Sequence, residues 1–408
     1  MRGSGSAREA RAIIAAGAVL IIMSFVMECG PAWAQAQAAP ARATATGLTD
    51  FEALAKRADE ARDAGELDEA VQTYRRALAL NPKWAEGWWS LGTLHYDADK
   101  YAEAELAFER VVALEPKQGT AHAMLGLCEF ELGQPERALK DIEVSKTLGV
   151  LEDKQLRDVV SYHEGILLQR AGQFEAAKSA LSSLCRSGMR SGELAGTFGM
   201  VALRMRDAVP PDPATEAGEV VQHVGRGACL GGAKEYEAAK AEFDQVIERA
   251  PHFPLLHYAY GCELVDARDI PGAVKEFEAE IAEQPKSVLP RLHIAVAEYK
   301  VDSAAGLKFA EEAVQLEPNL PLGHYLLGLL LLDTGAYERA VPELEIARRA
   351  FPQEGRIDLA LATGYAHVGR TQDAARSRAE FARKKQAEQA AAEGAVEITD
   401  AMDARSKR

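Results

Sequence analysis

Cysteine and aromatic residues are scarce in this chain: five of its 408 residues are Cys, and Phe, Trp and Tyr together make up 7%. Zinc sites built from cysteine need pairs of thiols a few residues apart. The cysteines that follow residue 34 have no such spacing, and they are Cys128, Cys185, Cys229 and Cys262. The sequence therefore contains no cysteine zinc motif.

Catalytic and nucleotide-binding motifs are also missing. The sequence has no nucleophile elbow, no phosphate loop and no HExxH pair. Gly225-Arg226-Gly227 begins like a dinucleotide fingerprint, but Leu230 stands where the last glycine should be, and the stretch is predicted to be helical. We therefore expect no enzymatic activity and no cofactor.

Positive charge is in the minority, with 47 Lys and Arg against 62 Asp and Glu and a formal net charge of −15. Residues 1–34 hold three Arg and two Glu, so their removal leaves 47 − 3 = 44 basic and 62 − 2 = 60 acidic residues, or −16. A surface of this sign repels nucleic acid and anionic lipid. We expect no nucleic-acid partner.

Only the N-terminus carries a long apolar run, Ala12–Met27, which follows a basic start. Ala32 and Ala34 supply the small residues of a cleavage site before Gln35. This pattern is typical of a secretory signal peptide over residues 1–34, cleaved between Ala34 and Gln35. It predicts export to the periplasm or beyond, with no integral membrane span after cleavage. An uncleaved inner-membrane anchor is the alternative, although the run is shorter than the ~20 residues of a spanning helix.

What the chain does have is a repeat of about 34 residues. The stretch from Ala85 to Gln118 is predicted to form two amphipathic helices with a turn near Asp99. A closing proline recurs at intervals of 33 or 34 residues, at Pro82 and Pro116 and again at Pro251, Pro285, Pro318 and Pro352. A small residue marks the first helix at the same period, at Gly92 and Gly126 and again at Gly227, Gly261, Ala295, Gly328 and Ala362. Two independent markers with one period predict stacked helix-turn-helix units.

This pattern resembles the tetratricopeptide repeat, whose signature is W-x2-L-G-x2-Y, then A-x3-F, then P. The matching residues in two copies are Trp88, Leu91, Gly92, Ala104, Phe108 and Pro116, and Leu327, Gly328, Ala340, Leu344 and Pro352. The small residues let the two helices of a unit approach closely, and the proline ends the second helix. The resemblance implies an exported bacterial-type repeat protein of the all-α class, folded as a right-handed superhelical solenoid of about nine repeats.

The repeats divide the chain into nine units: 51–84, 85–118, 119–152, 158–187, 220–253, 254–286, 287–320, 321–354 and 355–388. The fourth is degenerate, and an irregular lone helix near 192–206 and a Pro-rich joint at 207–215 follow it. We expect this joint to separate an N-terminal array (51–206) from a C-terminal array with a capping helix (216–393). Two terminal segments are predicted to be unstructured, a flexible leader (35–48) and a disordered tail (394–408).

Histidines and cysteines recur at fixed places in the units. The fourth position, where the signature has Trp, holds His in four units: His122, His223, His257 and His324. A position that returns with the repeat serves packing between helices, so we expect no metal site. Three cysteines lie in first helices beside the small residue, and we interpret them as buried thiols: Cys128, Cys229 and Cys262. A disulfide is the alternative, because export permits one.

In this repeat class, positions on the first helices line a concave groove. Apolar and tyrosine residues gather at these positions in the later units: Tyr258, Val265, Leu289, Leu292, Val296, Tyr299, Leu322, Tyr325, Leu329 and Leu332. They predict an apolar trough that suits a partner's amphipathic helix or extended segment. The alternative is that these side chains pack against the neighbouring repeat.

The prediction that follows is an exported scaffold or assembly adaptor that binds a protein or peptide in the concave groove. A self-assembling, homo-oligomeric envelope protein is the alternative from a different class. An enzyme, or an enzyme subunit with a site near the joint, is a distant third.

Overall fold

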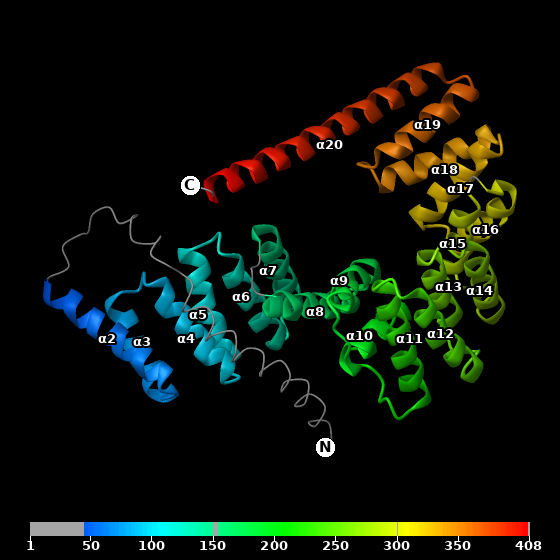
Figure 1. Ribbon diagram of the computed structural model, residues 1–408. Helices are drawn as coiled ribbons and strands as arrows, with labels where there is room; N and C mark the ends of the chain where they lie inside the picture. The colour runs from blue at the N-terminus through cyan, green and yellow to red at the C-terminus, as the bar shows by residue number, and fades with distance from the viewer. Residues whose placement is uncertain (1–44, 150–153, 300, 407–408) are drawn as a thin grey trace. The chain divides into compact units, whose positions relative to one another are not determined.

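The computed structural model describes residues 45–149, 154–299 and 301–406, which form helices and turns without a strand among them. The chain is an all-α helical repeat solenoid, in which short turns join most of the consecutive helices (Figure 1). The predicted signal peptide and its cleavage site at Ala34 and Gln35 lie outside the described residues.

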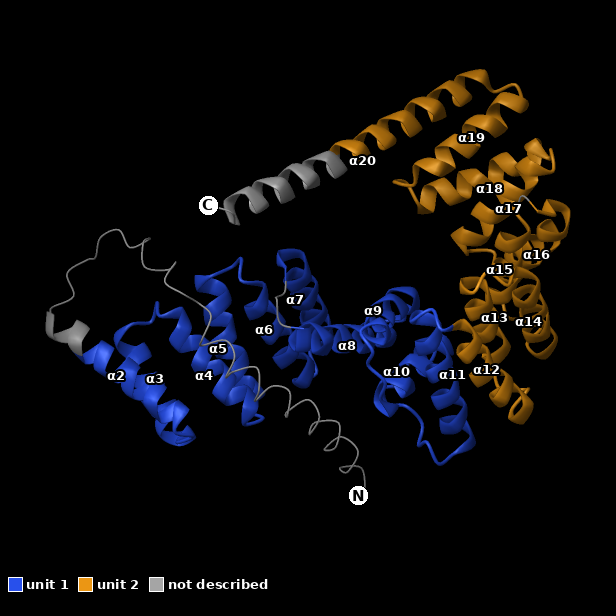
Figure 2. Ribbon diagram, in the orientation of Figure 1, with its two compact units in different colours: residues 1–235 blue, residues 236–408 orange. Residues whose placement is uncertain are grey.

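The chain divides into two compact units, Met1–Glu235 and Tyr236–Arg408 (Figure 2). In the first, consecutive helices pack as the hairpins α2/α3, α4/α5, α6/α7, α8/α9 and α10/α11. These helices are α2 (Ala45–Asp63), α3 (Leu67–Leu80), α4 (Ala85–Asp97), α5 (Tyr101–Leu114), α6 (Gly119–Glu131), α7 (Pro135–Leu148), α8 (Lys154–Arg170), α9 (Phe174–Arg186), α10 (Gly192–Ala202) and α11 (Glu216–Gly232).

In the second unit, α12 packs on α13, and the hairpins that follow are α13/α14, α15/α16, α17/α18 and α19/α20. These helices are α12 (Tyr236–Arg249), α13 (Leu256–Asp266), α14 (Ile270–Glu283), α15 (Leu289–Glu298), α16 (Ser303–Leu316), α17 (Pro321–Asp333), α18 (Tyr337–Ala350), α19 (Gly355–His367) and α20 (Thr371–Ser406). None of the described helices combines the length and apolarity that a membrane crossing requires.

The hairpin α17/α18 closes over the small residue that marks its first helix. At Gly328, an added Cβ would lie 2.6 Å from Leu344 Cγ, so only glycine leaves room for the leucine that α18 contributes. The second-helix alanines at the contact, Ala104 and Ala340, are fully buried, as is Phe108. At these positions small residues and one aromatic ring fill the contact between the two helices of a hairpin.

The turn between the two helices of a unit has its own 34-residue period. A left-handed residue occupies it at Gly65, Asp99, Gly133, Gly335 and Gly369, among others. At the second of these, Lys100 N–H donates to His95 O at 2.9 Å. This is the 6→1 bond of a helix that ends on a left-handed residue.

One helix of the first unit differs from its prediction. The segment 192–206 is not a lone helix, because its helical part, α10, packs closely on α11. Two glycines make this possible: an added Cβ at Gly199 would lie 1.9 Å from Val221 O, and one at Gly225 would lie 1.7 Å from Ala195 O. The interpretation of α10 as unpaired is therefore wrong.

Three boundaries also differ from their predicted places. The compact units meet between Glu235 and Tyr236, beyond the predicted joint at 207–215. Helix α2 begins at Ala45, inside the predicted leader, and α20 extends to Ser406, through most of the predicted tail. Alanine, glutamate, glutamine and lysine dominate 384–393, and these strong helix formers carry α20 past the last repeat.

Candidate protein-binding surface

The ten predicted trough residues lie on α13, α15 and α17 or at their ends, and the structure divides them by exposure. Tyr258 and Leu292 are buried, with 1% and 4% of their surface exposed. Val296 and Leu322 are exposed, at 56% and 43%. The other six are half-buried: Val265, Leu289, Tyr299, Tyr325, Leu329 and Leu332.

Tyr258 is part of the interior of the second unit. Its ring lies 6.0 Å from Phe277 and 5.4 Å from His293 between centroids, and its hydroxyl is 3.2 Å from His293 Nε2. Leu292 belongs to a buried cluster that includes Val288. The prediction that Tyr258 and Leu292 line an open trough is therefore wrong, because neighbouring helices cover both.

Four of the half-buried residues pack on the cores between repeats. Tyr299 and Leu332 lie against the cluster around Leu327 and Leu331, and Tyr325, Leu329 and again Leu332 lie against the cluster on α18 and α19. Burial raises the pKa of the Tyr325 hydroxyl above its usual range. These four side chains therefore pack against the neighbouring repeat, as in the alternative interpretation of the trough.

The accessible apolar surface of the first helices is consequently narrower than predicted, and it includes one residue that the prediction missed. Leu359 on α19 is 45% exposed, comparable with Leu322. It stands 34 residues after Tyr325, at the same position of the next unit, so the repeat period itself was the signal for it. We call Val296, Leu322 and Leu359 the apolar face.

Two of the recurring histidines, His122 and His324, each lie against two acceptors inside the repeats. His122 Nδ1 lies 2.6 Å from Asp141 and His324 Nδ1 lies 2.5 Å from Glu343. The other ring nitrogen faces the carbonyl of the closing proline of the preceding repeat, Pro116 O at 3.3 Å and Pro318 O at 2.8 Å. The two nitrogens of each ring thus face one carboxylate and one backbone carbonyl. We call these arrangements the histidine bridges.

The same arrangement occurs around His257 on α13. Its Nδ1 lies 2.6 Å from Glu276 Oε2, and this hydrogen bond, with a further one to the Pro251 backbone, raises the pKa of His257. In all three bridges the carboxylate follows the histidine by 19 residues, and Glu242 follows His223 by the same interval in sequence. The recurrence of the histidine alone predicted the packing role, and this interval, which points to the carboxylate partner, was missed. The repeat marker Trp88 makes the equivalent bond, with its Nε1 donating to Pro82 O at 3.0 Å.

Glu129 on α6 is a buried carboxylate beside a crowded arginine. Its side chain is fully buried, and neither oxygen has a hydrogen bond within the described residues. Arg137 Nη2 lies 2.9 Å from Glu129 Oε1 but also reaches Glu109, while its Nη1 reaches Glu105. Burial raises the pKa of Glu129 to about 7, and the nearby negative charge of Asp141 adds to this shift.

Two of the cysteines form a disulfide, which the sequence supported only as the alternative to buried thiols. Cys185 on α9 and Cys229 on α11 are bonded, so the interpretation of Cys229 as a thiol is wrong. Cys128 and Cys262 are not disulfide-bonded. Burial, the largest cause, raises the pKa of the Cys128 thiol well above its usual range, which makes it a poor nucleophile.

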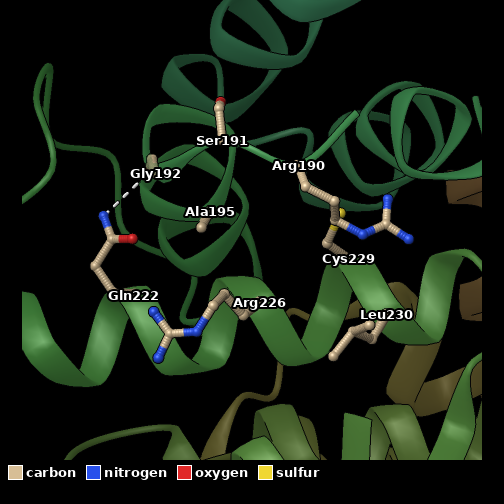
Figure 3. A pocket seen from close by; sticks show the side chains of 8 residues that line it. All are labelled: Arg190, Ser191, Gly192, Ala195, Gln222, Arg226, Cys229 and Leu230. Carbon is tan, nitrogen blue, oxygen red and sulfur yellow. Dashed lines mark hydrogen bonds between the residues drawn. The ribbon is translucent and has the colours of Figure 1, made fainter. Parts of the chain in front are cut away.

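A cavity of about 320 Å³ lies beside this disulfide, between α10 and α11 (Figure 3). Its polar side chains are engaged locally: Arg190 Nη2 donates to Glu235 at 2.9 Å, and Gln222 Nε2 donates to Gly192 O at 3.0 Å. Among the described residues, no three His, Cys, Asp or Glu side chains come together as a metal site would need.

Comparisons with known proteins agree with the repeat pattern. A "TPR repeat" family model matches residues 58–99 and a "Tetratricopeptide repeat" model matches residues 90–145. The general transcriptional corepressor trfA of Dictyostelium discoideum is 26% identical over 126 residues, which are 31% of this chain and 9% of that protein. Protein O-mannosyl-transferase TMTC1 of Homo sapiens is 34% identical over 58 residues, 14% of this chain and 7% of that protein. The chain thus matches less than a tenth of the length of either relative.

Two solved structures are similar at low identity. A crystal structure of MamA is 16% identical with a TM-score of 0.37, and the match covers 40% of this chain and 95% of that one. A tetratricopeptide repeat protein from Parabacteroides merdae is 15% identical with a TM-score of 0.33, covering 69% and 99%. The two family models identify tetratricopeptide repeats in residues 58–145, and helical hairpins of the same 34-residue period continue beyond them.

Proposed function

We propose that this protein is an exported scaffold or assembly adaptor that holds a protein partner on the first helices of its second unit. The observation that carries the proposal is the apolar face. Large apolar side chains stand exposed on three consecutive first helices, α15, α17 and α19, at positions that the packing of the repeats does not need. An amphipathic helix or extended segment of a partner would cover them.

The double variant Leu322→Glu with Leu359→Glu is expected to lose at least about 90% of partner capture, because each charge would be buried against apolar partner atoms. The measurement is a crosslinking pull-down from the envelope fraction with the full-length chain. Both residues are partly exposed, so far-UV circular dichroism should be unchanged. Their buried neighbours, such as Leu292, are unsuitable for this test.

Leu316→Glu is the matched control, since Leu316 is 38% exposed but lies on the second helix α16. Equal capture by the double variant and this control would refute the apolar face as the binding surface. Light scattering across protein concentrations covers the alternative of self-assembly. A mass that grows with concentration in the wild type and not in the double variant would identify a second copy as the partner.

The disulfide supports export. Structural disulfides persist in oxidising compartments and are rare in the cytosol. We therefore expect the mature protein from the envelope fraction to begin at Gln35 and to keep Cys185 and Cys229 bonded. In denatured protein, a maleimide polymer should add to two of the four cysteines before reduction and to all four after it.

The variant Cys185→Ala serves as the control for this count, because it leaves three cysteines reactive without reduction. Four reactive cysteines in unreduced wild-type protein, or an N-terminus at Met1, would contradict export in this form.

A further inference from the structure

A basic depression lies in the second unit where α18 ends, α19 begins and α20 passes. Its volume is about 520 Å³. Its lining includes four cationic side chains, Arg348, Arg349, Arg383 and Lys384, and only two carboxylates, Asp358 and Glu380. The local balance is therefore +4 − 2 = +2, on a chain whose formal net charge is −15.

Both carboxylates already have a cation. Lys384 Nζ donates to Asp358 Oδ2 at 2.5 Å, and Arg383 Nη2 donates to Glu380 Oε2 at 2.7 Å. The first pair is buried, with 10% and 2% of the two side chains exposed, and it forms the floor of the depression. The charges of each of these two ion pairs cancel, so the net positive charge of the lining lies on the remaining cationic side chains.

That charge belongs to Arg348 and Arg349, in the last turn of α18. Neither makes an ion pair with a described residue. The carbonyl groups at the C-terminal end of a helix interact favourably with nearby cations. This interaction leaves the paired N–H donors of each guanidinium group available to other acceptors. The paired N–H donors of a guanidinium group match the two oxygens of a carboxylate and bind it bidentately.

From this geometry we infer that the basic depression binds an acidic segment of a protein partner, rich in aspartate or glutamate. The volume of about 520 Å³ lies within the range of ligand pockets. Arg348 and Arg349 both line the depression, and neither guanidinium has a carboxylate partner among the described residues. The inference rests on the proposed function only in taking a protein as the ligand, because it does not use Leu322 or Leu359.

The test is fluorescence anisotropy with a labelled peptide of alternating glutamate and glycine and the mature full-length protein at low salt. The peptide should bind despite the negative net charge of the chain. Arg348→Gln with Arg349→Gln should weaken it at least about 10-fold, and rising salt should weaken the wild type more than this variant. Arg376→Gln with Arg378→Gln removes the same charge from exposed parts of α20 and should change binding less than about 2-fold.

Three outcomes would overturn the inference: equal losses in both double variants, equal binding of a lysine-glycine peptide, or tight binding of inorganic phosphate without binding of the acidic peptide. The last would assign the depression to a small oxyanion. If the acidic peptide fails while Leu322→Glu with Leu359→Glu still abolishes partner capture, only this inference is lost and the proposed function stands.

Discussion

Replacement of Lys384 by methionine should lower the free energy of unfolding by about 3–5 kcal/mol, since it leaves a buried carboxylate without its cation. Only 2% of the Asp358 side chain is exposed, and Lys384 supplies its charged partner at 2.5 Å. The measurement is guanidinium denaturation of the mature chain, followed by far-UV circular dichroism.

Two further variants make this expectation specific. The pair Lys384→Met with Asp358→Leu should recover most of the loss, because it removes the second charge as well. Arg383→Met, one residue away, breaks an ion pair whose side chains are 68% and 50% exposed, and should cost less than about 1 kcal/mol. Similar losses in the free energy of unfolding for Lys384→Met and Arg383→Met would show that the buried Lys384–Asp358 ion pair does not hold α20 in place.

Replacement of Glu129 by glutamine should have a large effect of the opposite sign, raising the free energy of unfolding at pH 8 by up to about 3 kcal/mol. The pKa of Glu129 is raised from 4.5 to about 7 in the folded chain. The folded state therefore holds its proton more tightly than the unfolded state does. The stability that this proton contributes is complete below pH 4.5, falls as pH rises, and is lost above pH 7.

The variant carries no such proton, so its advantage should shrink below about 1 kcal/mol near pH 5. Urea denaturation at pH 5 and pH 8 measures both values. Glu109→Gln is the control, because this carboxylate contacts the same Arg137 but is 43% exposed. It should stay within about 0.5 kcal/mol of the wild type. A gain for Glu129→Gln that does not change with pH would contradict the assignment.

Most of the fold could be predicted because the repeat places its chemical markers at short, regular intervals. Gly328 and Leu344 stand 16 residues apart and meet across one hairpin, so the sequence reveals their contact directly. The pairing of α10 with α11 has no such marker. It depends on glycines of irregular spacing, Gly199 and Gly225, that touch backbone rather than side chains.

The candidate surface was harder to predict, because exposure depends on the neighbouring repeats. Tyr258, Leu292 and Leu322 occupy equivalent faces of their helices, yet the first two are covered and the third is open. The disulfide between Cys185 and Cys229 joins residues 44 apart from a degenerate unit and an irregular hairpin. No periodic rule brings such residues together.

The histidine bridges have a consequence for how the stack opens. Each ring joins the second helix of its own repeat to the closing turn of the repeat before it, so opening of the turn at Pro318 removes an acceptor from His324. In a one-dimensional array, such links add to the nearest-neighbour coupling that makes repeats melt together. At His257, whose pKa is raised, this coupling is complete at acidic pH and fades as pH rises through the folded pKa. The repeats that His257 joins should therefore open together more often in acid than in alkali, as hydrogen exchange would register.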